Sequence, residues 1–216
     1  MGSPSPSRPQ DVPPTLDLVY APWAAELAEQ LLAEALPDRW AHSHGVGLYA
    51  RELGWLAGEH ADALEAAAFL HDIGYAPTVR ETGFHPLDSA RYLRDRTDAS
   101  PLICMLVANH TGALIEGRHR GLSGVIESEF PIGASPNREP TALITHCDLS
   151  VGPTGSRISA VTRLREIANR YAPDHPVNRS INESKPLLLE CDRKVRSWIE
   201  SEDPKRTSPP PAHPPG

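Results

Sequence analysis

The sequence has few cysteines, no long apolar run and no excess of basic residues. Its three cysteines, Cys104, Cys147 and Cys191, are odd in number and widely spaced, so they predict buried reduced thiols rather than a disulfide framework or a paired-cysteine zinc site. No apolar run approaches the roughly 20 residues that a membrane-spanning helix needs, and the first residues do not resemble a secretory signal. We therefore expect a soluble cytoplasmic protein without a membrane partner.

Positive charge is also scarce. The sequence has 21 Lys and Arg residues against 28 Asp and Glu residues, which gives a formal net charge of -7. Non-specific binding to nucleic acid needs a basic face that releases phosphate counterions, so we expect no nucleic-acid polymer as a partner. A small anionic substrate would have to be held by local groups.

Runs of alternating β-branched residues and internal repeats are absent, whereas apolar residues recur at helical spacing through most of the chain. This pattern predicts an all-α fold, and a chain of 216 residues suits one core. Both ends are proline-rich and cannot bury enough apolar surface to offset the entropy of ordering. We predict a disordered tail over residues 1–16, one helical domain over 17–202 and a second disordered tail over 203–216.

Proline, glycine and capping residues predict where the helices begin and end. Residues 113–139 give a weaker pattern, with one short helix over 122–130 followed by a polar loop through Gly133, Pro136 and Asn137. The other expected helices run from the turn at Pro22 to Pro37, from an Asp38 cap to about Gly58, from an Asp62–Glu65 capping box to Gly74, from Pro86 onward, from Ser100–Pro101 to Gly112, from Glu139–Pro140 through Asp148, and over 157–171 and 176–201.

Histidine and aspartate residues fall on the inner faces or at the ends of several of these helices. A neutral imidazole binds a divalent ion, and an adjacent carboxylate can bind the same ion or bridge to another. An isolated His-Asp pair is more often a hydrogen-bonded part of a core. Partners on separate helices make the pair a predicted metal centre, whose members are His42, His71, Asp72, His85, His110 and Asp148.

The segments around these residues read RWAHSHGV, FLHDIGY, GFHPLDSARYL, VANHTGA and ITHCDLSVGPTG. Over residues 39–155 they resemble the HD-domain superfamily of metal-dependent phosphohydrolases. The resemblance implies an HD-domain helical bundle in which His42, His71, Asp72 and Asp148 bind a first ion. His85 and His110 resemble the additional ligands of two-metal members, with Asp72 bridging, although His85 follows His71 more closely than in several two-metal relatives.

Histidine-rich ligation with carboxylates fits a divalent transition metal better than an all-oxygen magnesium site, and we favour Mn or Fe over Co, Ni or Zn. Two ions would supply hydroxide to a phosphorus atom and neutralise charge on the attacked and departing oxygens. The resemblance thus implies hydrolysis of a phosphomonoester or phosphodiester of a small molecule, and family tendencies suggest a nucleotide.

Arg39 lies three residues before His42 on the same helix face, where a guanidinium suits bidentate recognition of phosphate. It resembles the arginine that precedes the first histidine in many HD proteins. The alternative is a surface salt bridge to an acid such as Glu34. We predict Asp72 and Arg39 as catalytic residues, with weaker arginine candidates at positions 80, 91 and 157.

Three neighbours of the ligands stay outside the predicted set. Asp88 follows His85 by one helical turn, so it either orients that imidazole or stabilises the helix N-terminus. Thr111 can face the pocket or serve an ordinary turn. His146 can support Asp148 as a hydrogen-bond partner in the outer layer of the site.

Two other functions stay open. Some HD-related oxygenases use two irons held by a similar set of six ligands, but the phosphonate-cleaving ones carry acidic and tyrosyl gating residues before the first histidine, and residues 31–35 of this chain contain no tyrosine. A catalytically silent nucleotide-binding HD module is the other, and the presence of every expected ligand gives it no support. The HHExxDGxGYP-type segment of enzymes that cleave cyclic dinucleotides is absent.

Overall fold

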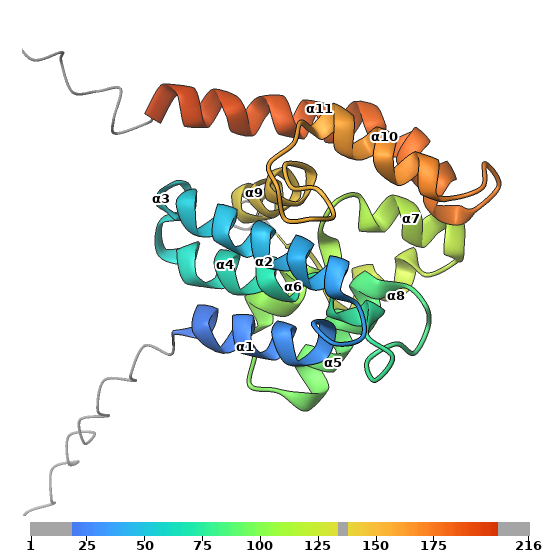
Figure 1. Cartoon of the computed structure of the whole chain (residues 1–216), viewed down its shortest axis with the longest axis horizontal. Coiled ribbons are helices and arrows are strands. Elements are labelled where there is room, and N and C mark those ends of the chain that lie inside the picture. Colours follow the sequence, from blue (N-terminus) through green and yellow to red (C-terminus); the bar gives the residue numbers. More distant parts are fainter. Residues whose placement is uncertain (1–18, 134–137, 203–216) are drawn as a thin grey trace, which may run out of the picture.

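The structure, a computed structural model, describes residues 19–133 and 138–202. Within these ranges the chain forms helices and no strand, and its one isolated β-bridge joins Val151 and Arg157. The predicted all-α fold is confirmed. The helices (Figure 1) are α1 (Tyr20–Leu32), α2 (Pro37–Glu52), α3 (Gly54–Ala57), α4 (Ala61–Leu70), α5 (His85–Arg96), α6 (Pro101–Asn109), α7 (Ala113–Arg120), α8 (Ser123–Glu129), α9 (Arg138–Leu149), α10 (Ala160–Arg170) and α11 (Pro176–Glu202), with short 3-10 turns η1 (Gly58–His60) and η2 (Ile73–Tyr75).

The predicted tails over 1–16 and 203–216 lie outside the described residues, as do Pro136 and Asn137 of the predicted polar loop. The domain boundaries at 17 and 202 stay a prediction. Among the described helices, none combines the length and the apolar character that crossing a membrane requires.

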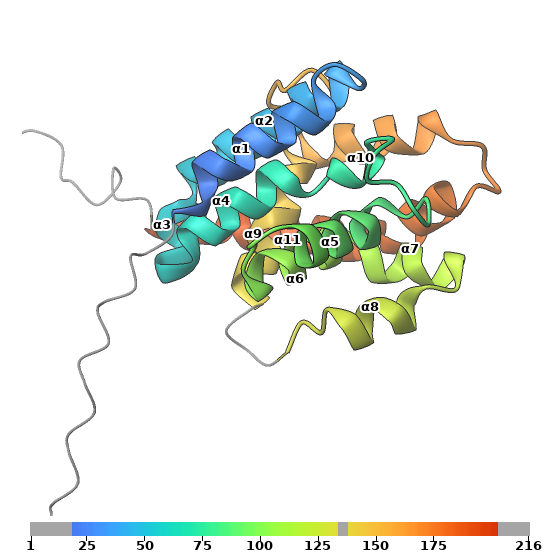
Figure 2. The same ribbon diagram turned by 90° about the horizontal axis from the view of Figure 1, so that it is seen from below.

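Helix α4 lies at the centre of the fold. Its sequence is rich in alanine, the residue with the highest helix propensity, and its side chains from Leu64 to Leu70 are buried. Helices α1 and α2 pack beside it (Figure 2), and α6 and α9 also contact it. Because α4 ends inside this packing, the next two residues, His71 and Asp72, enter the interior of the protein.

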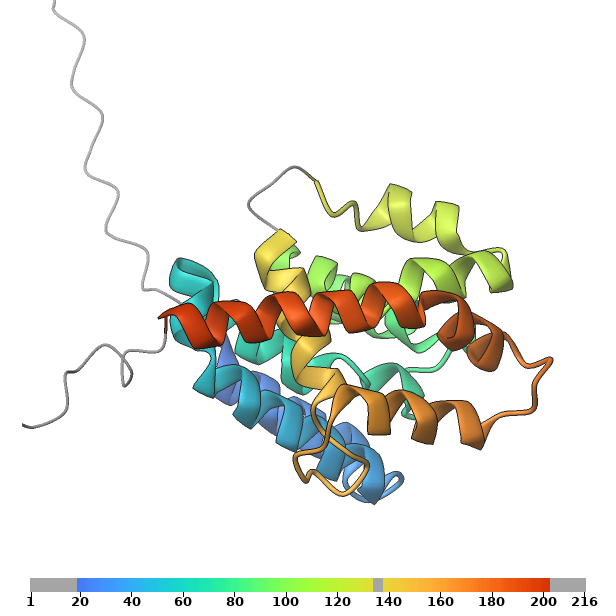
Figure 3. The same cartoon turned by 90° about the horizontal axis from the view of Figure 1, so that it is seen from above.

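Helices α10 and α11 form a layer of their own across α9 and α7, as Figure 3 shows for the long helix α11. They share a second, smaller apolar core that includes Leu149, Leu164 and Ile181. This layer follows the last predicted ligand, Asp148, in the sequence. It therefore places a separate set of side chains beside the centre of the fold.

Asp62 caps a helix other than its own. Its carboxylate accepts the backbone N–H groups of Tyr20 at 2.7 Å and Ala21 at 3.1 Å, which are free donors in the first turn of α1. No side chain caps α4, so the predicted capping box of Asp62 with Glu65 is wrong. Glu65 instead accepts a hydrogen bond from Arg51 at 2.8 Å.

Two further predicted boundaries need correction. Helix α2 ends at Glu52 rather than near Gly58, because the chain turns there into α3 and η1. Asp38 lies in the first turn of α2, but Leu36 is the N-cap residue and no side chain caps this helix. The predicted Asp38 cap is therefore wrong.

Helix α7 lies in the segment where the sequence pattern predicts only one short helix over 122–130. That predicted helix is confirmed as α8. Gly112 and Gly121 flank α7 with φ values of 75° and 72°, a left-handed conformation that favours glycine. These two glycines are the signal that would have located α7 from the sequence.

Candidate metal centre

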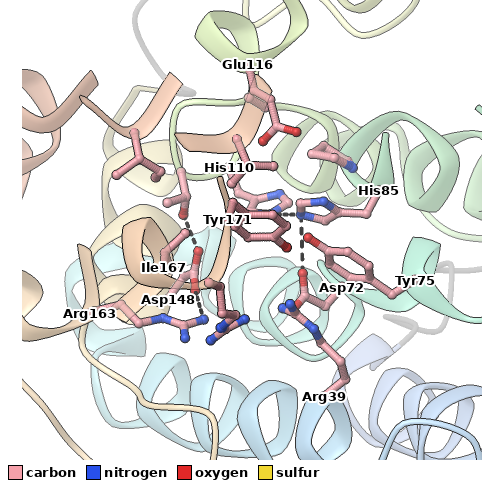
Figure 4. Close-up of a pocket in the computed structure, with 16 residues that line it drawn as sticks. Arg39, Asp72, Tyr75, His85, His110, Glu116, Asp148, Arg163, Ile167 and Tyr171 are labelled. Atoms are coloured by element: carbon pink, nitrogen blue, oxygen red, sulfur yellow. Dashed lines mark hydrogen bonds and ion pairs between the residues drawn. The ribbon is translucent and has the colours of Figure 1, made fainter. Parts of the chain in front are cut away.

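The structure brings all six predicted ligand residues together, and they come from five helices. Five of the six are buried, and His85 is partly exposed. His42 lies within α2, His71 and Asp72 follow α4, His85 begins α5, His110 follows α6, and Asp148 lies in the last turn of α9. Figure 4 shows the pocket that several of them line.

One half of the site is formed by His42, His71 and Asp148. The Nε2 atom of His42 lies 3.0 Å from Oδ1 of Asp148, and Nε2 of His71 lies 4.0 Å from the same oxygen. One ligand atom from each of these residues lies within 4.8 Å of the other two. This spacing suits a single ion held by two imidazoles and a carboxylate.

Asp72 joins this half of the site to the other. Its Oδ2 atom lies 3.6 Å from Nε2 of His71 and 4.0 Å from Nε2 of His42, whereas its Oδ1 atom lies 3.3 Å from Nε2 of His85. His110 completes a second close group with His71 and Asp72. Because its two oxygens face different imidazoles, the Asp72 carboxylate has the arrangement of a bridging ligand.

Gly74 allows α5 to approach closely enough to deliver His85. A Cβ atom at position 74 would lie 2.3 Å from the backbone oxygen of His85, which excludes any other residue there without a shift of backbone. The backbone N–H of Gly74 donates to Oγ of Ser89 at 2.7 Å, and that hydroxyl donates to the backbone oxygen of His71 at 3.1 Å. Gly74 is therefore a close-packing residue, while α4 already ends at Leu70.

Backbone contacts assign the proton on the histidine rings. Nδ1 of His71 lies 2.7 Å from the backbone oxygen of Ala68, and Nδ1 of His110 lies 2.7 Å from that of Val107. We assign the ring proton to Nδ1 in both, which turns the Nε2 lone pairs toward the carboxylates, as in metal-binding histidines. The buried Nε2 of His71 has no hydrogen-bond partner among the described residues.

This donor set fits a divalent transition metal. Lone pairs of several imidazoles and two carboxylates converge, and Nε2 of His85 lies only 3.2 Å from Nε2 of His110. A buried acceptor without a partner costs about 1–3 kcal/mol, and a cation between these groups would remove that cost. Mixed nitrogen and oxygen ligation of this kind suits Mn, Fe, Co, Ni or Zn.

The electrostatic environment keeps three of the predicted ligands, Asp72, His85 and His110, in the protonation states that bind metal. Burial raises the pKa of Asp72, but the charge of Arg39 and the nearby histidines outweigh burial and hold that pKa well below its usual range. Burial lowers the pKa of His85 and of His110, so both imidazoles are neutral near pH 7. Metal binding needs this combination of ionised carboxylates and neutral imidazoles.

Arg39 contacts the centre of the site directly. Its Nη1 atom donates to Oδ2 of Asp72 at 2.6 Å, and its guanidinium lies 4.0 Å above the ring of Tyr75. Tyr75 in turn stacks on His85 with ring centroids 4.2 Å apart. The alternative pairing of Arg39 with Glu34 is therefore wrong.

Asp88 stabilises the loop before α5 rather than a ligand. Its carboxylate accepts the backbone N–H groups of Glu81 at 3.1 Å, Thr82 at 3.0 Å and Gly83 at 3.0 Å. No contact with the imidazole of His85 accompanies these bonds among the described residues. Asp88 therefore fixes the path of the chain into α5, a role that neither sequence interpretation included.

His146 belongs to a separate buried network. Its Nε2 atom lies 3.0 Å from the hydroxyl of Tyr49 in α2, and its Nδ1 atom lies 2.8 Å from Oδ1 of Asp192 in α11. The network ties α2, α9 and α11 together two residues from Asp148. It joins helices that carry the site without reaching the pocket.

Thr111 contacts a predicted ligand, a role that the sequence did not distinguish from that of an ordinary turn residue. Its hydroxyl donates to Oδ2 of Asp148 at 2.5 Å, and its φ of 40° is unusual for a β-branched residue. Because Oδ2 is held by Thr111, the other carboxylate oxygen of Asp148 faces His42. Thr111 therefore orients a predicted ligand.

Arg163 of α10 is the second residue that sequence reasoning missed. It is buried, and its Nη2 atom lies 3.0 Å from Nε2 of His42. The weaker arginine candidates at positions 80, 91 and 157 do not line the pocket. The signal for Arg163 is its position on the apolar face of an amphipathic helix, one residue before buried Leu164 and three after buried Ala160.

The pocket over the site encloses about 520 Å³, part of it open to solvent. Polar residues of the centre form one side, and residues of α10 and α11 form much of the other. In Figure 4 the ring of Tyr171, the residue after α10, lies over this space with its hydroxyl toward Tyr75. The lining includes Arg39, Asp72, Tyr75, His85, His110, Thr111, Glu116, Asp148, Arg163, Ile167, Arg170, Tyr171, Val177 and Ile181.

Comparison with known proteins identifies a family for this chain. The family described as HD domain matches residues 39–151, which are 113 of the 216 residues. A search of the curated proteins and a search of the solved structures each found no match. The matched region begins at Arg39 and includes every predicted ligand, whereas α10 and α11 follow it. The chain therefore belongs to the HD-domain superfamily of metal-dependent phosphohydrolases.

Proposed function

We propose that this HD-domain protein hydrolyses a phosphomonoester or phosphodiester of a small molecule with the help of bound divalent metal. The observation that carries the proposal is the convergence of imidazole Nε2 atoms on the carboxylates of Asp72 and Asp148, with the buried Nε2 of His71 lacking a hydrogen-bond partner in the described part of the chain. Lone pairs that face one another in this way are unfavourable without a cation and favourable around one.

The distances support a proposal of two ion positions. His42, His71, Asp72 and Asp148 would hold a first ion, while His85 and His110 would hold a second, with Asp72 shared between the two. We favour Mn or Fe as the native metal because the set combines imidazoles with carboxylates. When bound, such ions lower the pKa of water and neutralise negative charge on phosphoryl oxygens.

The protein's own residues prepare the site for an anionic substrate. Arg39 keeps Asp72 ionised and presents its guanidinium to the pocket, where it can donate to phosphoryl oxygens. Burial raises the pKa of Tyr75, so its hydroxyl stays protonated and can donate a hydrogen bond. Among the described residues that line the pocket, none is serine or cysteine, so water is the nucleophile that we propose.

These groups support the substrate class that we propose. Guanidinium groups and a metal centre in one partly enclosed pocket suit a small phosphorylated molecule. The tendency of HD proteins toward nucleotides makes a nucleotide the first candidate, with no base-specific contact to support it further.

The proposal is tested by purifying the protein without oxygen, measuring its metal content and screening phosphate release with added Mn²⁺ or Fe²⁺. Suitable probes are p-nitrophenyl phosphate, bis(p-nitrophenyl) phosphate and a panel of nucleotides. We expect phosphate release that depends on metal. Oxygen uptake without phosphate release would contradict hydrolysis and favour a di-iron oxygenase, and stoichiometric metal without any turnover would favour a silent binding module.

Variants at the His-Asp pair test the site itself. His71→Ala and Asp72→Ala should lose metal and phosphate release, because both residues contact each half of the site. His44→Ala is the matched control, since His44 lies on α2 near the site but is exposed and faces Trp40. Full metal content in both pair variants would contradict the assignment.

A further inference from the structure

Arg163 reaches the metal centre from outside the region that the HD family matches. It is 3% exposed, and its Nη2 atom lies 3.0 Å from Nε2 of His42 and 3.6 Å from Oδ1 of Asp148. Its Nη1 atom donates to Glu166 at 2.8 Å. Its buried Nε atom has no hydrogen-bond partner among the described residues.

A guanidinium in this position does not help to hold a cation. Its positive charge repels any metal ion bound by His42 and Asp148, and its unpaired Nε–H is an unfavourable buried donor. Glu166 pairs with Nη1 of Arg163, and an anionic oxygen beside the guanidinium would satisfy the donor that is left over. Arginine suits this task because its planar group donates two parallel hydrogen bonds to an oxyanion.

Arg163 and Arg39 approach the site from different helices and different sides. Figure 4 shows Arg163 beside Asp148, and Arg39 beside Asp72 across the pocket. A tetrahedral phosphoryl group has several oxygens and can contact both guanidinium groups at once. The pair therefore forms two sides of an oxyanion site above the two carboxylates.

Apart from Arg170, whose guanidinium donates to Glu166, the rest of the wall from α10 and α11 is largely apolar. Ile167 lies one helical turn after Arg163, and Tyr171 lies about one turn further. Val177 and Ile181 of α11 line the same pocket. Because these side chains offer apolar and aromatic surface next to the oxyanion site, they suit an apolar organic group attached to the phosphate.

We propose that Arg163 binds the phosphoryl oxygens of the substrate and that the α10–α11 wall binds an apolar, aromatic-sized organic group attached to them. The inference rests on the proposed hydrolase function and adds the residues that select the substrate. The metal ligands then come from the family region, and selectivity comes from the two helices after it.

Arg163→Met removes the guanidinium and leaves an unbranched apolar side chain in its place. We expect inorganic phosphate to bind the Mn²⁺-loaded variant at least about tenfold more weakly than the wild type, by titration calorimetry, as loss of a charge-assisted hydrogen bond implies. Mn²⁺ affinity should be unchanged or higher, which also shows that the variant is folded. Arg163→Lys should recover part of the phosphate affinity.

Arg165→Met is the matched control, because Arg165 is exposed on the same helix and does not line the pocket. Equal phosphate affinity in the Arg163→Met and Arg165→Met proteins would overturn the role of Arg163. Weaker Mn²⁺ binding in Arg163→Met would also overturn it, since Arg163 would then support the ligands. If one of these two results is found but the wild type still releases phosphate from esters, the role of Arg163 fails and the proposed hydrolase function stands. If the loaded wild type binds no phosphate, both proposals fail.

A pair of small probes tests the apolar wall. Phenyl phosphate and glycerol phosphate carry the same charged group but differ in the polarity of the attached part. We expect phenyl phosphate to bind the Mn²⁺-loaded wild type about tenfold more tightly, since burial of a phenyl ring contributes favourably. Equal or tighter binding of glycerol phosphate would overturn the apolar preference.

Discussion

Replacement of Arg39 by methionine should destabilise the metal-depleted protein by an amount that the structure allows us to estimate. Arg39 and Asp72 form an ion pair at 2.6 Å, in which the Asp72 side chain is 3% exposed and the Arg39 side chain is 20% exposed. Loss of one partner of a buried pair costs about 3–5 kcal/mol, because the remaining charge stays buried. Because the Arg39 side chain is 20% exposed, water can partly replace its guanidinium beside Asp72, so we expect about 3 kcal/mol, at the lower end of that range.

Urea unfolding in the presence of a chelator measures this loss. With a urea dependence of about 2–3 kcal/mol per molar, the midpoint should fall by about 1–1.5 M. Arg91→Met is the matched control, since Arg91 pairs with Glu129 on the surface with side chains 27% and 25% exposed. A surface pair contributes about 0–1 kcal/mol.

The effect of pH has a definite sign. In the wild type the pKa of Asp72 is lowered, so the pair contributes stability above the unfolded pKa of the carboxyl group and loses it as pH falls through the folded pKa. In Arg39→Met burial remains while the charge of Arg39 is gone, so the pKa of Asp72 rises. Protonation of Asp72 then removes the unpaired buried charge from the variant. The loss in free energy of unfolding, relative to the wild type, should therefore be largest at pH 8 and smaller at pH 5.

Added Mn²⁺ should reduce the difference in urea midpoint between the wild type and Arg39→Met. A metal ion bound by Asp72 supplies positive charge to the carboxylate that Arg39 no longer contacts, so the metal should raise the midpoint of the variant more than that of the wild type. If Arg39→Met is as stable as Arg91→Met in chelator at pH 8, the reasoning about a buried Asp72 charge is refuted.

Two other outcomes follow from the contacts of the site, and a third follows from the surroundings of two cysteines. His85→Ala and His110→Ala should each reduce the Mn²⁺ content from two ions to one per chain, and an unchanged count of two by elemental analysis would exclude them as ligands of a second ion. Thr111→Val keeps the β-branched shape but removes the hydroxyl on Asp148, so Mn²⁺ affinity should fall about 10-fold or more, while Thr111→Ser should retain it; equal affinities in a calorimetric titration would argue against this positioning role. Cys104 is buried and Cys191, which the sequence also predicts as buried, is only partly buried. Desolvation raises the pKa of both thiols to about 11, so they should react slowly with Ellman's reagent at pH 8, where only about 0.1% is thiolate; rapid labelling of both before unfolding would contradict this shielding.

Features that depend on neighbouring residues in the chain were predictable from the sequence. The alanine-rich segment of α4, Pro101 at the start of α6 and the Ser100 cap each act within one helical turn, and Ser100 does accept the backbone N–H of Ile103. The placement of two of the predicted ligands was predictable for a related reason. His71 and His110 each follow the last turn of a helix and bond the backbone oxygen three residues earlier, so local geometry alone aims their Nε2 atoms.

Features that depend on partners far along the chain were not predictable in this way. Asp62 has the sequence context of a cap for its own helix, yet the free N–H groups of α1 lie closer to its carboxylate. Its partner is about 40 residues away, and no local pattern identifies it. The same holds for Asp88, whose neighbours suggest a helix terminus while its carboxylate holds the preceding loop.

The site shows why this division matters for function. Most of the predicted ligands lie at helix ends, where local geometry places them, so HD proteins can share them while they differ in substrate. The groups that set the charge and shape of the pocket, such as Arg163 and Tyr171, come from a layer that packs on the family region only through tertiary contacts. The position of Thr111 also depends on a tertiary contact, because its hydroxyl donates to Asp148, which lies 37 residues further along the sequence. A sequence motif therefore predicts the kind of chemistry here, and on our proposal the packing of α10 and α11 decides which molecule can reach it.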